Sequence, residues 1–180
     1  MPTSPIPSRC STTSVVKFHW FDGIDLDGRD PIEIAVDKCM AAVSSGLRLW
    51  NPFARAMIQA EFRGRIALAT QGELKPIEQV KDVGGTPVVE PLYEIRWQEI
   101  AVTDAATSST PKSHYEVMVR LYHSEPSEEP EYFIGHHAHE KVIDGSETWN
   151  LQTAEIQVAA GYYRLGEGVN WGIVHACSNP

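Results

Sequence analysis

The sequence lacks the features that mark membrane-spanning, secreted and disulfide-rich proteins. No run of about 18 apolar residues occurs, which excludes a helix that spans a bilayer. The opening residues, MPTSPIPSRCSTTS, show no basic start followed by an apolar stretch and do not resemble a secretory signal. The three cysteines are odd in number, widely spaced and without a CxxC pair. We therefore expect reduced thiols in a cytoplasmic protein, with neither a disulfide framework nor a zinc site built from these cysteines.

Positive charge and the common catalytic signatures are also scarce. The formal net charge of the 180 residues is -9, whereas a protein that binds nucleic acid usually carries a basic face. Such a face can therefore be only local in this chain. No GxSxG, GxGxxG, P-loop or HExxH motif occurs. Hydrophobic residues make up 42% and charged residues 22% of the chain, which is ordinary for a globular protein with one core.

The first half of the chain predicts a short strand followed by helices. Pro, Ser and Thr dominate residues 1–14, which we expect to be a flexible arm, with an N-terminal extension over 15–50 and the main domain over 51–180. Pro after Asp30 and after Asn51 is typical of helix starts. The predicted elements are a strand over Val15–Phe21, a helix from Pro31 to Gly46, a helix from Pro52 to Thr70 and a short helix over Pro76–Val80.

The second half alternates in the manner of strands. The predicted elements are strands over Leu92–Ile100, His114–Ser124 and Tyr132–Val142, a polar loop over Thr103–Ser113, and a helix over Thr153–Leu165 capped by Thr153 or Asn150. The pattern predicts an α+β fold in which N-terminal helices pack on a small antiparallel sheet with a C-terminal helix. Alternation places Glu94 and Arg96 on the sheet face away from the core.

Two arginines are expected side by side on that outer face. Arg96 and Arg120 lie on successive predicted strands. Two guanidinium groups on one sheet face form a clamp for phosphate. The alternative is that each pairs with a carboxylate such as Glu94 or Glu116, and the sequence leaves both interpretations open.

A histidine cluster follows on the third strand. Alternation puts His137, His139 and Lys141 on one face and His136 on the other. Imidazoles titrate near neutrality, so they can move the protons of an RNA-cleaving reaction while cations stabilise the phosphate. Two alternatives remain: an HxH metal site completed by Glu140 or His123, and histidines that are exposed without a chemical role.

Four short motifs occur in a characteristic order. They are LYEIR at 92–96, VRLY at 119–122, HHAHEK at 136–141 and EIQVAA at 155–160. Over about residues 53–165 the chain resembles the phage-derived HigB-like branch of the RelE/ParE toxin superfamily. Only Lys141 stands where that branch has paired lysines, and His139 replaces the preceding aromatic residue.

The resemblance implies a RelE-like fold and the function of a toxin in a toxin–antitoxin pair. Such a toxin is an endoribonuclease that cleaves mRNA, in some cases on the ribosome, and is restrained by a small antitoxin protein. It needs no metal or cofactor and does not bind membranes, or DNA by itself. The candidate catalytic residues are Arg96, Arg120, His137, His139 and Lys141, of which His137 and Lys141 match family positions and His139 does not. The candidate substrate-binding residues are Tyr122, Tyr163 and Arg164.

Two other functions stay open at this point. The acidic balance and the missing second lysine favour a non-enzymatic binding or assembly protein of phage or prophage type on the same fold. The pair His137 and His139 favours a metal-dependent enzyme that acts on a small molecule. Tyr163 either stacks on a base or packs on the sheet.

Overall fold

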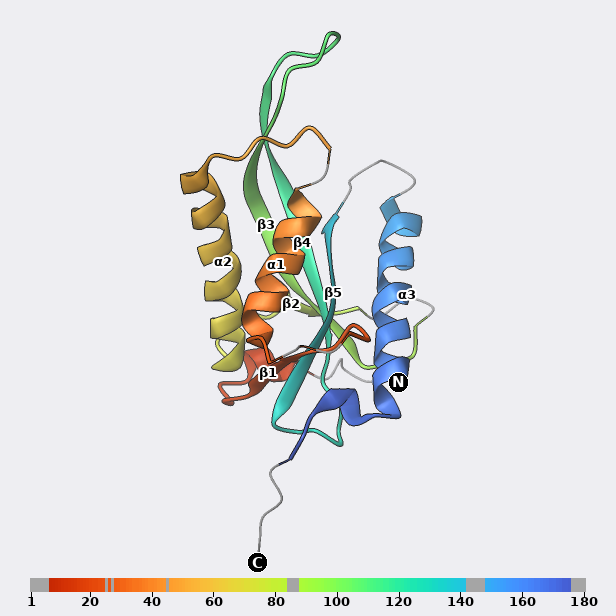
Figure 1. The fold of residues 1–180 in the computed structure, drawn as a ribbon. Helices are drawn as coiled ribbons and strands as arrows, with labels where there is room; N and C mark the ends of the chain where they lie inside the picture. Colours follow the sequence, from red (N-terminus) through yellow and green to blue (C-terminus); the bar gives the residue numbers. More distant parts are fainter. Residues whose placement is uncertain are drawn as a thin grey trace, which may run out of the picture.

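The computed structural model describes residues 7–24, 26, 28–44, 46–83, 88–141 and 148–175 (Figure 1). Its helices and strands follow one another along the chain as η1 (Arg9–Ser11), β1 (Lys17–Trp20), α1 (Pro31–Val43), α2 (Pro52–Thr70), β2 (Val80–Asp82), β3 (Leu92–Asp104), β4 (Ser113–Ser124), β5 (Tyr132–Lys141), α3 (Thr148–Glu167) and η3 (Asn170–Gly172). Val142, the predicted end of the third strand, lies outside the described residues.

One five-stranded sheet organises the fold, with the strand order β1-β5-β4-β3-β2. The strands from β2 to β5 pair antiparallel, whereas β1 pairs parallel with β5, and Lys17 lies opposite Tyr132. The α+β class is therefore as predicted, but the sheet is mixed and not antiparallel. The reason is a pairing between residues more than a hundred positions apart, which no local pattern encodes.

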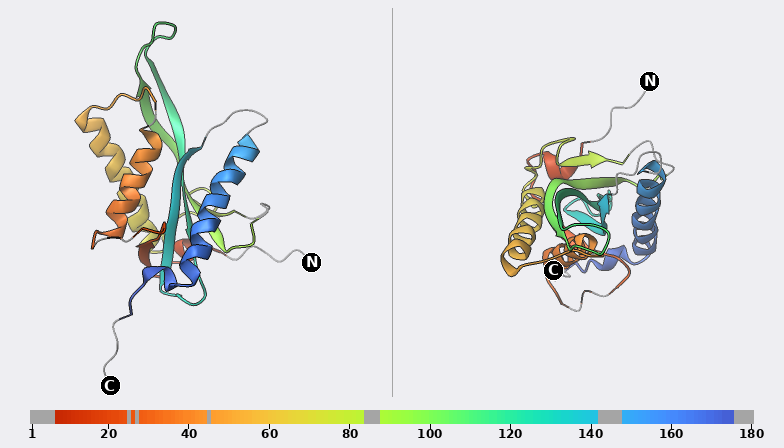
Figure 2. Two further views of the ribbon diagram at one scale, coloured as in Figure 1. Left: turned by 45° about the vertical axis from the view of Figure 1, so that its right-hand side comes forward. Right: turned by 90° about the horizontal axis from the view of Figure 1, so that it is seen from above.

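Helices cover both faces of the sheet. α1 and α2 lie on one face and α3 on the other, as the view from above in Figure 2 shows. The larger core lies under α1 and α2, where Phe62 of α2 meets Trp97 of β3 edge-to-face at 5.1 Å. A smaller core lies under α3 and includes Ile156, Tyr163 and Trp171. Apolar side chains on both sides thus hold the sheet between two layers of helices.

The starts of α1 and α2 follow directly from the sequence. The Asp30 carboxylate accepts a hydrogen bond from the Ile32 amide at 2.8 Å, and the Asn51 side chain accepts one from the Ala54 amide at 2.8 Å. Each cap is followed by proline at the first helical position. Both predicted helices are therefore confirmed, although α1 ends at Val43, before Gly46.

Three boundaries differ from the prediction. The segment predicted as a short helix over Pro76–Val80 is a turn that leads into β2, because Val80 pairs with Ile95 across the sheet. The predicted polar loop between β3 and β4 is shorter, because the strands run on to Asp104 and restart at Ser113 as a hairpin that projects beyond the helices (Figure 1). α3 begins at Thr148, ahead of both predicted caps.

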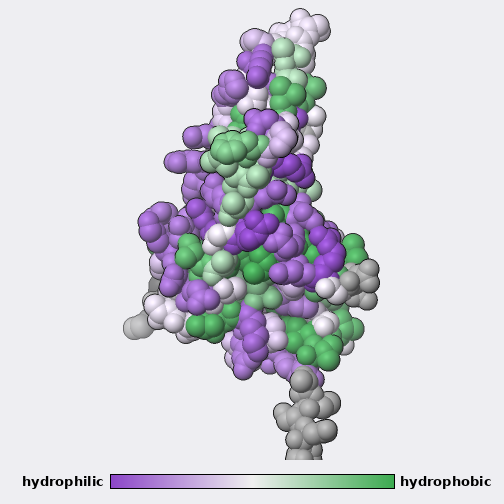
Figure 3. Space-filling model, turned by 60° about the vertical axis from the view of Figure 1, so that its left-hand side comes forward, coloured by the Kyte–Doolittle hydropathy of each residue, from purple (hydrophilic) through white to green (hydrophobic). Residues whose placement is uncertain are grey.

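Polar and apolar side chains both reach the surface. The space-filling view in Figure 3 shows a mostly hydrophilic face with scattered apolar patches. No helix of the described residues combines the length and apolar character needed to cross a bilayer.

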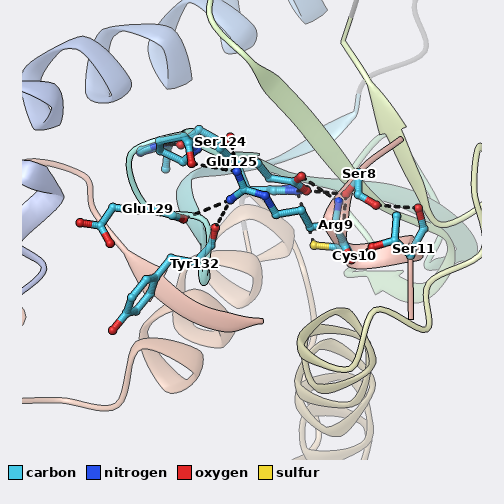
Figure 4. A network of polar contacts seen from close by, with 12 residues as sticks. Ser8, Arg9, Cys10, Ser11, Ser124, Glu125, Glu129 and Tyr132 are labelled. Atoms are coloured by element: carbon cyan, nitrogen blue, oxygen red, sulfur yellow. Dashed lines mark hydrogen bonds and ion pairs between the residues drawn. The ribbon is translucent and has the colours of Figure 1, made fainter. Parts of the chain in front are cut away.

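Part of the segment predicted as a flexible arm packs on the domain. Cys10 of η1 is fully buried. The Arg9 guanidinium donates hydrogen bonds to the backbone carbonyls of Glu125, Pro126, Glu129 and Tyr132 at 2.8–3.2 Å (Figure 4). These bonds join the arm to carbonyls of the β4–β5 connection and of Tyr132 at the start of β5, so the arm and the connection hold each other in place.

Candidate active site

The register of three strands brings the predicted catalytic residues together. Arg96 of β3 lies opposite Arg120 of β4, and Arg120 lies opposite His139 of β5. His137 pairs with Tyr122 one step along the same face, and Lys141 pairs with Met118. Because side chains alternate along each strand, these residues share one face of the sheet, which is the face under α3. We refer to Arg96, Arg120, His137, His139 and Lys141 as the cationic cluster.

This face is not an open outer surface, contrary to the expectation from alternation. α3 packs over it and builds its own core there. The side chain of Arg120 is fully buried, whereas those of Arg96 and His137 are 19% and 24% exposed. Alternation separates the two faces correctly but cannot tell that a helix later in the chain covers the second face.

Glu94 lies at the centre of the arginine pair. Its carboxylate is 3.3 Å from Arg96 Nε and 3.5 Å from Arg120 Nε. Arg120 also donates to the carbonyls of Trp97 and Val119 at 3.1 and 2.9 Å. The carboxylate pairing considered from the sequence thus occurs through Glu94 and not Glu116. With its guanidinium buried and engaged in this way, Arg120 orders the sheet face beneath the more exposed Arg96.

His137 is paired with a carboxylate from α3. Its Nε2 lies 2.5 Å from Glu155 Oε2. A carboxylate accepts, so Nε2 carries the proton and Nδ1 presents its lone pair. This pairing holds the tautomer in which the imidazole can take up a proton at Nδ1.

His139 has both ring nitrogens engaged. Nδ1 lies 3.1 Å from the Glu140 carbonyl oxygen and therefore carries the proton, and Nε2 accepts from the Tyr122 hydroxyl at 3.1 Å. Burial is the main cause that lowers the pKa of His139 to about 4, and the ring is neutral near pH 7. The His139 ring stacks parallel to His137, with centroids 6.1 Å apart.

Comparison with protein-family models, curated proteins and solved structures gives no match.

His136 does not lie on the opposite face, as strict alternation predicted. The register between β4 and β5 shifts at Tyr122 and His123, which leaves His136 as an extra residue on β5. Its ring meets Tyr163 of α3 edge-on, donates to the Phe21 carbonyl at 2.9 Å and accepts from the Ser124 hydroxyl at 2.8 Å. Burial lowers the pKa of His136 to about 4. It serves as a neutral, fully hydrogen-bonded core histidine.

The α3 face concentrates positive charge in an otherwise acidic chain. Burial is the main cause that lowers the pKa of Lys141. The nearby cations Arg120, Arg96 and Lys81 also lower this pKa, whereas the Glu94 carboxylate raises it. Lys81 of β2 lies opposite Glu94 and is exposed. Three of the five Lys and Arg residues that follow Glu90 lie in this cluster. Glu94 and Glu155 lie on the same face and pair with Arg96, Arg120 and His137, so part of this positive charge is balanced by carboxylates.

The three residues expected to bind substrate lie elsewhere or are buried. Tyr122 is fully buried beneath α3, and Tyr163 is 8% exposed and packs on Trp171 with centroids 5.3 Å apart. Neither ring offers a stacking surface for a base in this structure. Arg164 is on the exposed side of α3 and pairs with Glu90.

Two candidate groups on this face are not among the residues predicted from the sequence. Lys81 lies between two predicted elements, and Glu155 enters only as part of the EIQVAA motif. Glu155 is placed by the helical spacing of α3 above β5, where it meets His137. A carboxylate on the closing helix facing the histidine strand was the signal that could have indicated the pair.

Proposed function

We propose that the protein is an endoribonuclease that acts at the α3 face of the sheet, as the toxin of a toxin–antitoxin pair. The observation that carries the proposal is the gathering of two imidazoles, one of them paired with a carboxylate, beside several cations on one sheet face of a chain with net charge -9. RNA cleavage by the 2'-hydroxyl needs a base, an acid and positive charge at the phosphate.

His137 is assigned the proton-transfer role. Nδ1 takes the proton of the 2'-hydroxyl while Glu155 stabilises the imidazolium through Nε2. The 2'-oxygen attacks phosphorus and the bond to the 5'-oxygen breaks. The 5'-oxygen takes a proton from water, and the His137 imidazolium then returns the proton that it accepted to the resulting hydroxide. The products are a 2',3'-cyclic phosphate and a 5'-hydroxyl. Arg96 and Lys141, both partly exposed, contact the phosphate.

Arg120 and His139 act as positioning residues in this proposal. Arg120 is fully buried and holds Glu94, which in turn orients Arg96. His139 is fixed by the Glu140 carbonyl and the Tyr122 hydroxyl, and its ring sets the orientation of His137 by stacking. Both residues support the reacting groups without touching the phosphate.

The toxin assignment and the RelE-like fold rest on the four-motif resemblance. Within the stretch that the resemblance covers, α2, the strands β3 to β5 and the closing helix α3 follow one another in the order that it implies, whereas α1 lies before that stretch. A small antitoxin protein, mRNA and the ribosome as partners, and a cytoplasmic location, belong to the same proposal.

A second candidate function has one observation in its favour. Arg120, Tyr122 and Glu94 are buried beneath α3, so only part of the cationic cluster reaches solvent. A non-enzymatic binding protein needs only the part of the cationic cluster that is exposed to solvent. The metal-dependent alternative is not favoured, because the Nε2 atoms of His137 and His139 are bonded to Glu155 and Tyr122.

Tightly controlled expression in bacteria tests the enzyme. Wild-type protein is expected to arrest growth and to create new 5'-hydroxyl ends in mRNA. His137→Ala is expected to abolish both effects, and Arg96→Ala to weaken them about 100-fold or more, as loss of a transition-state charge contact does. His114→Ala is the matched control, because His114 is an exposed histidine on the projecting hairpin.

The outcomes are distinct. Harmless wild-type expression with unchanged RNA ends, despite folded protein, contradicts the nuclease and favours the binding protein. Arrest that persists unchanged in His137→Ala also contradicts the assigned chemistry.

A further inference from the structure

A second cluster of reactive side chains lies on the opposite face of the sheet, where β4 ends. Cys10 of η1, His123 of β4 and Glu125 just beyond β4 each place one potential ligand atom within 4.8 Å of the other two. Cys10 Sγ lies 3.7 Å from His123 Nε2, and Nε2 lies 3.2 Å from Glu125 Oε1. All three residues are buried. Among the described residues no other set of three such groups comes this close together.

We propose that Cys10, His123 and Glu125 bind one Zn²⁺ ion. In a tetrahedral zinc site with bonds of about 2.0–2.3 Å, neighbouring ligand atoms lie about 3.3–3.6 Å apart. The separations of 3.7 and 3.2 Å are close to this spacing, and the third pair of ligand atoms lies within 4.8 Å. Thiolate, imidazole and carboxylate are the three ligand types that zinc takes in proteins.

Zinc binds cysteine as the thiolate. Metal binding at Cys10 would therefore deprotonate the thiol and release one proton.

The carboxylate and the imidazole are already held in position. Glu125 Oε1 accepts from the Ser8 hydroxyl at 2.5 Å, and Oε2 accepts from the Arg9 amide at 2.7 Å. The His123 ring stacks on Tyr93 with centroids 5.6 Å apart. A tetrahedral site on these three ligands would take a fourth ligand, such as water. Such ordering by surrounding groups is what a metal site requires.

The consequence of zinc binding is a tether between the N-terminal arm and the sheet. Cys10 belongs to the arm, whereas His123 is in β4 and Glu125 directly follows β4, more than a hundred residues later. Zinc would reinforce the contacts that Arg9 makes with the β4–β5 connection (Figure 4). The site is separate from the cationic cluster, so it stands independently of the proposed ribonuclease.

Metal analysis of the full-length protein tests the site. Protein stripped with a chelator is titrated with Zn²⁺, and bound metal is measured by mass spectrometry, with thermal unfolding alongside. Wild type is expected to bind one equivalent and to unfold at a higher temperature with metal. Cys10→Ser and His123→Gln are expected to lose both effects. Cys39→Ser is the matched control, because Cys39 is also fully buried but belongs to no such cluster.

Cobalt gives a second measurement that does not depend on the variants folding. Co²⁺ bound to wild-type protein is expected to show a thiolate-to-metal charge-transfer band and the visible spectrum of tetrahedral coordination. Absence of one-equivalent binding by wild type overturns the proposal. So does a cobalt spectrum without the thiolate band, or equal binding by the folded Cys10 and His123 variants.

Discussion

The two faces of the sheet differ in what their side chains bury. Toward α1 and α2, the strands present apolar residues such as Ile95, Val119 and Leu121, all fully buried. Toward α3, the neighbouring positions on the same strands present Glu94 and Arg120, which are also buried. Alternation therefore lets three strands build a hydrophobic core on one side and a charged cluster on the other.

The two faces differ in how much they contribute to the stability of the fold. Apolar burial stabilises by about 25 cal/mol per Å² of surface removed from water. A buried ion pair is weak evidence for stability, because apolar residues of similar volume often do as well or better. The larger core on the α1/α2 face thus supplies most of the apolar stabilisation, and the smaller core under α3 supplies the rest. The buried ions of the α3 face add little to that stability by themselves.

The largest expected effect is on the apolar face. Phe62→Ala removes a fully buried ring that packs edge-on against Trp97. The free energy of unfolding is expected to fall by about 3–5 kcal/mol, measured by urea denaturation. Phe53→Ala in the same helix is the control, because Phe53 is 75% exposed, and it should change little. Equal losses in the two variants would contradict the packing described for α2.

A change at the centre of the charged face comes next. Glu94→Gln leaves the buried Arg120 guanidinium without its carboxylate. Unfolding free energy is expected to drop by about 3 kcal/mol, since breaking a buried pair leaves an uncompensated charge. Glu116→Gln on the exposed part of β4 provides the comparison. If both substitutions behave alike, Glu94 does not hold the arginine pair.

A smaller effect is expected from pH. His136 has a pKa of about 4 in the folded protein against 6.5 for an exposed histidine. The unfolded chain therefore binds the extra proton first, and stability is full above about pH 6.5 and declines toward about pH 4. The single site contributes about 2–3 kcal/mol over that range. Urea denaturation at several values between about pH 7 and pH 4.5 measures how the free energy of unfolding changes with pH.

His136→Gln should flatten that slope, and His114→Gln should not, because His114 is exposed. A wild-type protein equally stable at both ends of the range would show that His136 is not held neutral in the core.

Much of the fold could be predicted from local patterns. Asp30 and Asn51, each before proline, marked the two helix starts, and alternation separated Glu94 and Arg96 from Ile95 and Trp97. What could not be predicted depends on contacts between distant segments. These include the parallel pairing of β1 with β5, the short strand β2 and the cover that α3 places over the sheet.

The candidate site divides in the same way. Strand register grouped Arg96, Arg120 and His137 as alternation predicted. The burial of Arg120 and the pairing of His137 with Glu155 arise from α3, whose docking the sequence pattern does not reveal. Strict alternation along a strand also does not predict the β-bulge that turns His136 toward α3. The cluster around Cys10 joins residues 113 positions apart, so no spacing motif marks it.

The central claim, that the α3 face meets phosphates, is tested most directly by the salt dependence of RNA binding. Affinity for a labelled single-stranded RNA is measured by fluorescence anisotropy across salt concentrations for wild type, Arg96→Gln, Lys141→Met and the control Arg63→Gln. Arg63 lies on α2 and pairs with Glu33. Each substitution on the α3 face is expected to reduce the slope of log affinity against log salt by about 0.7, with no change for Arg63→Gln. Wild-type protein without measurable RNA binding would contradict the account. So would slopes in Arg96→Gln and Lys141→Met that equal the wild-type slope.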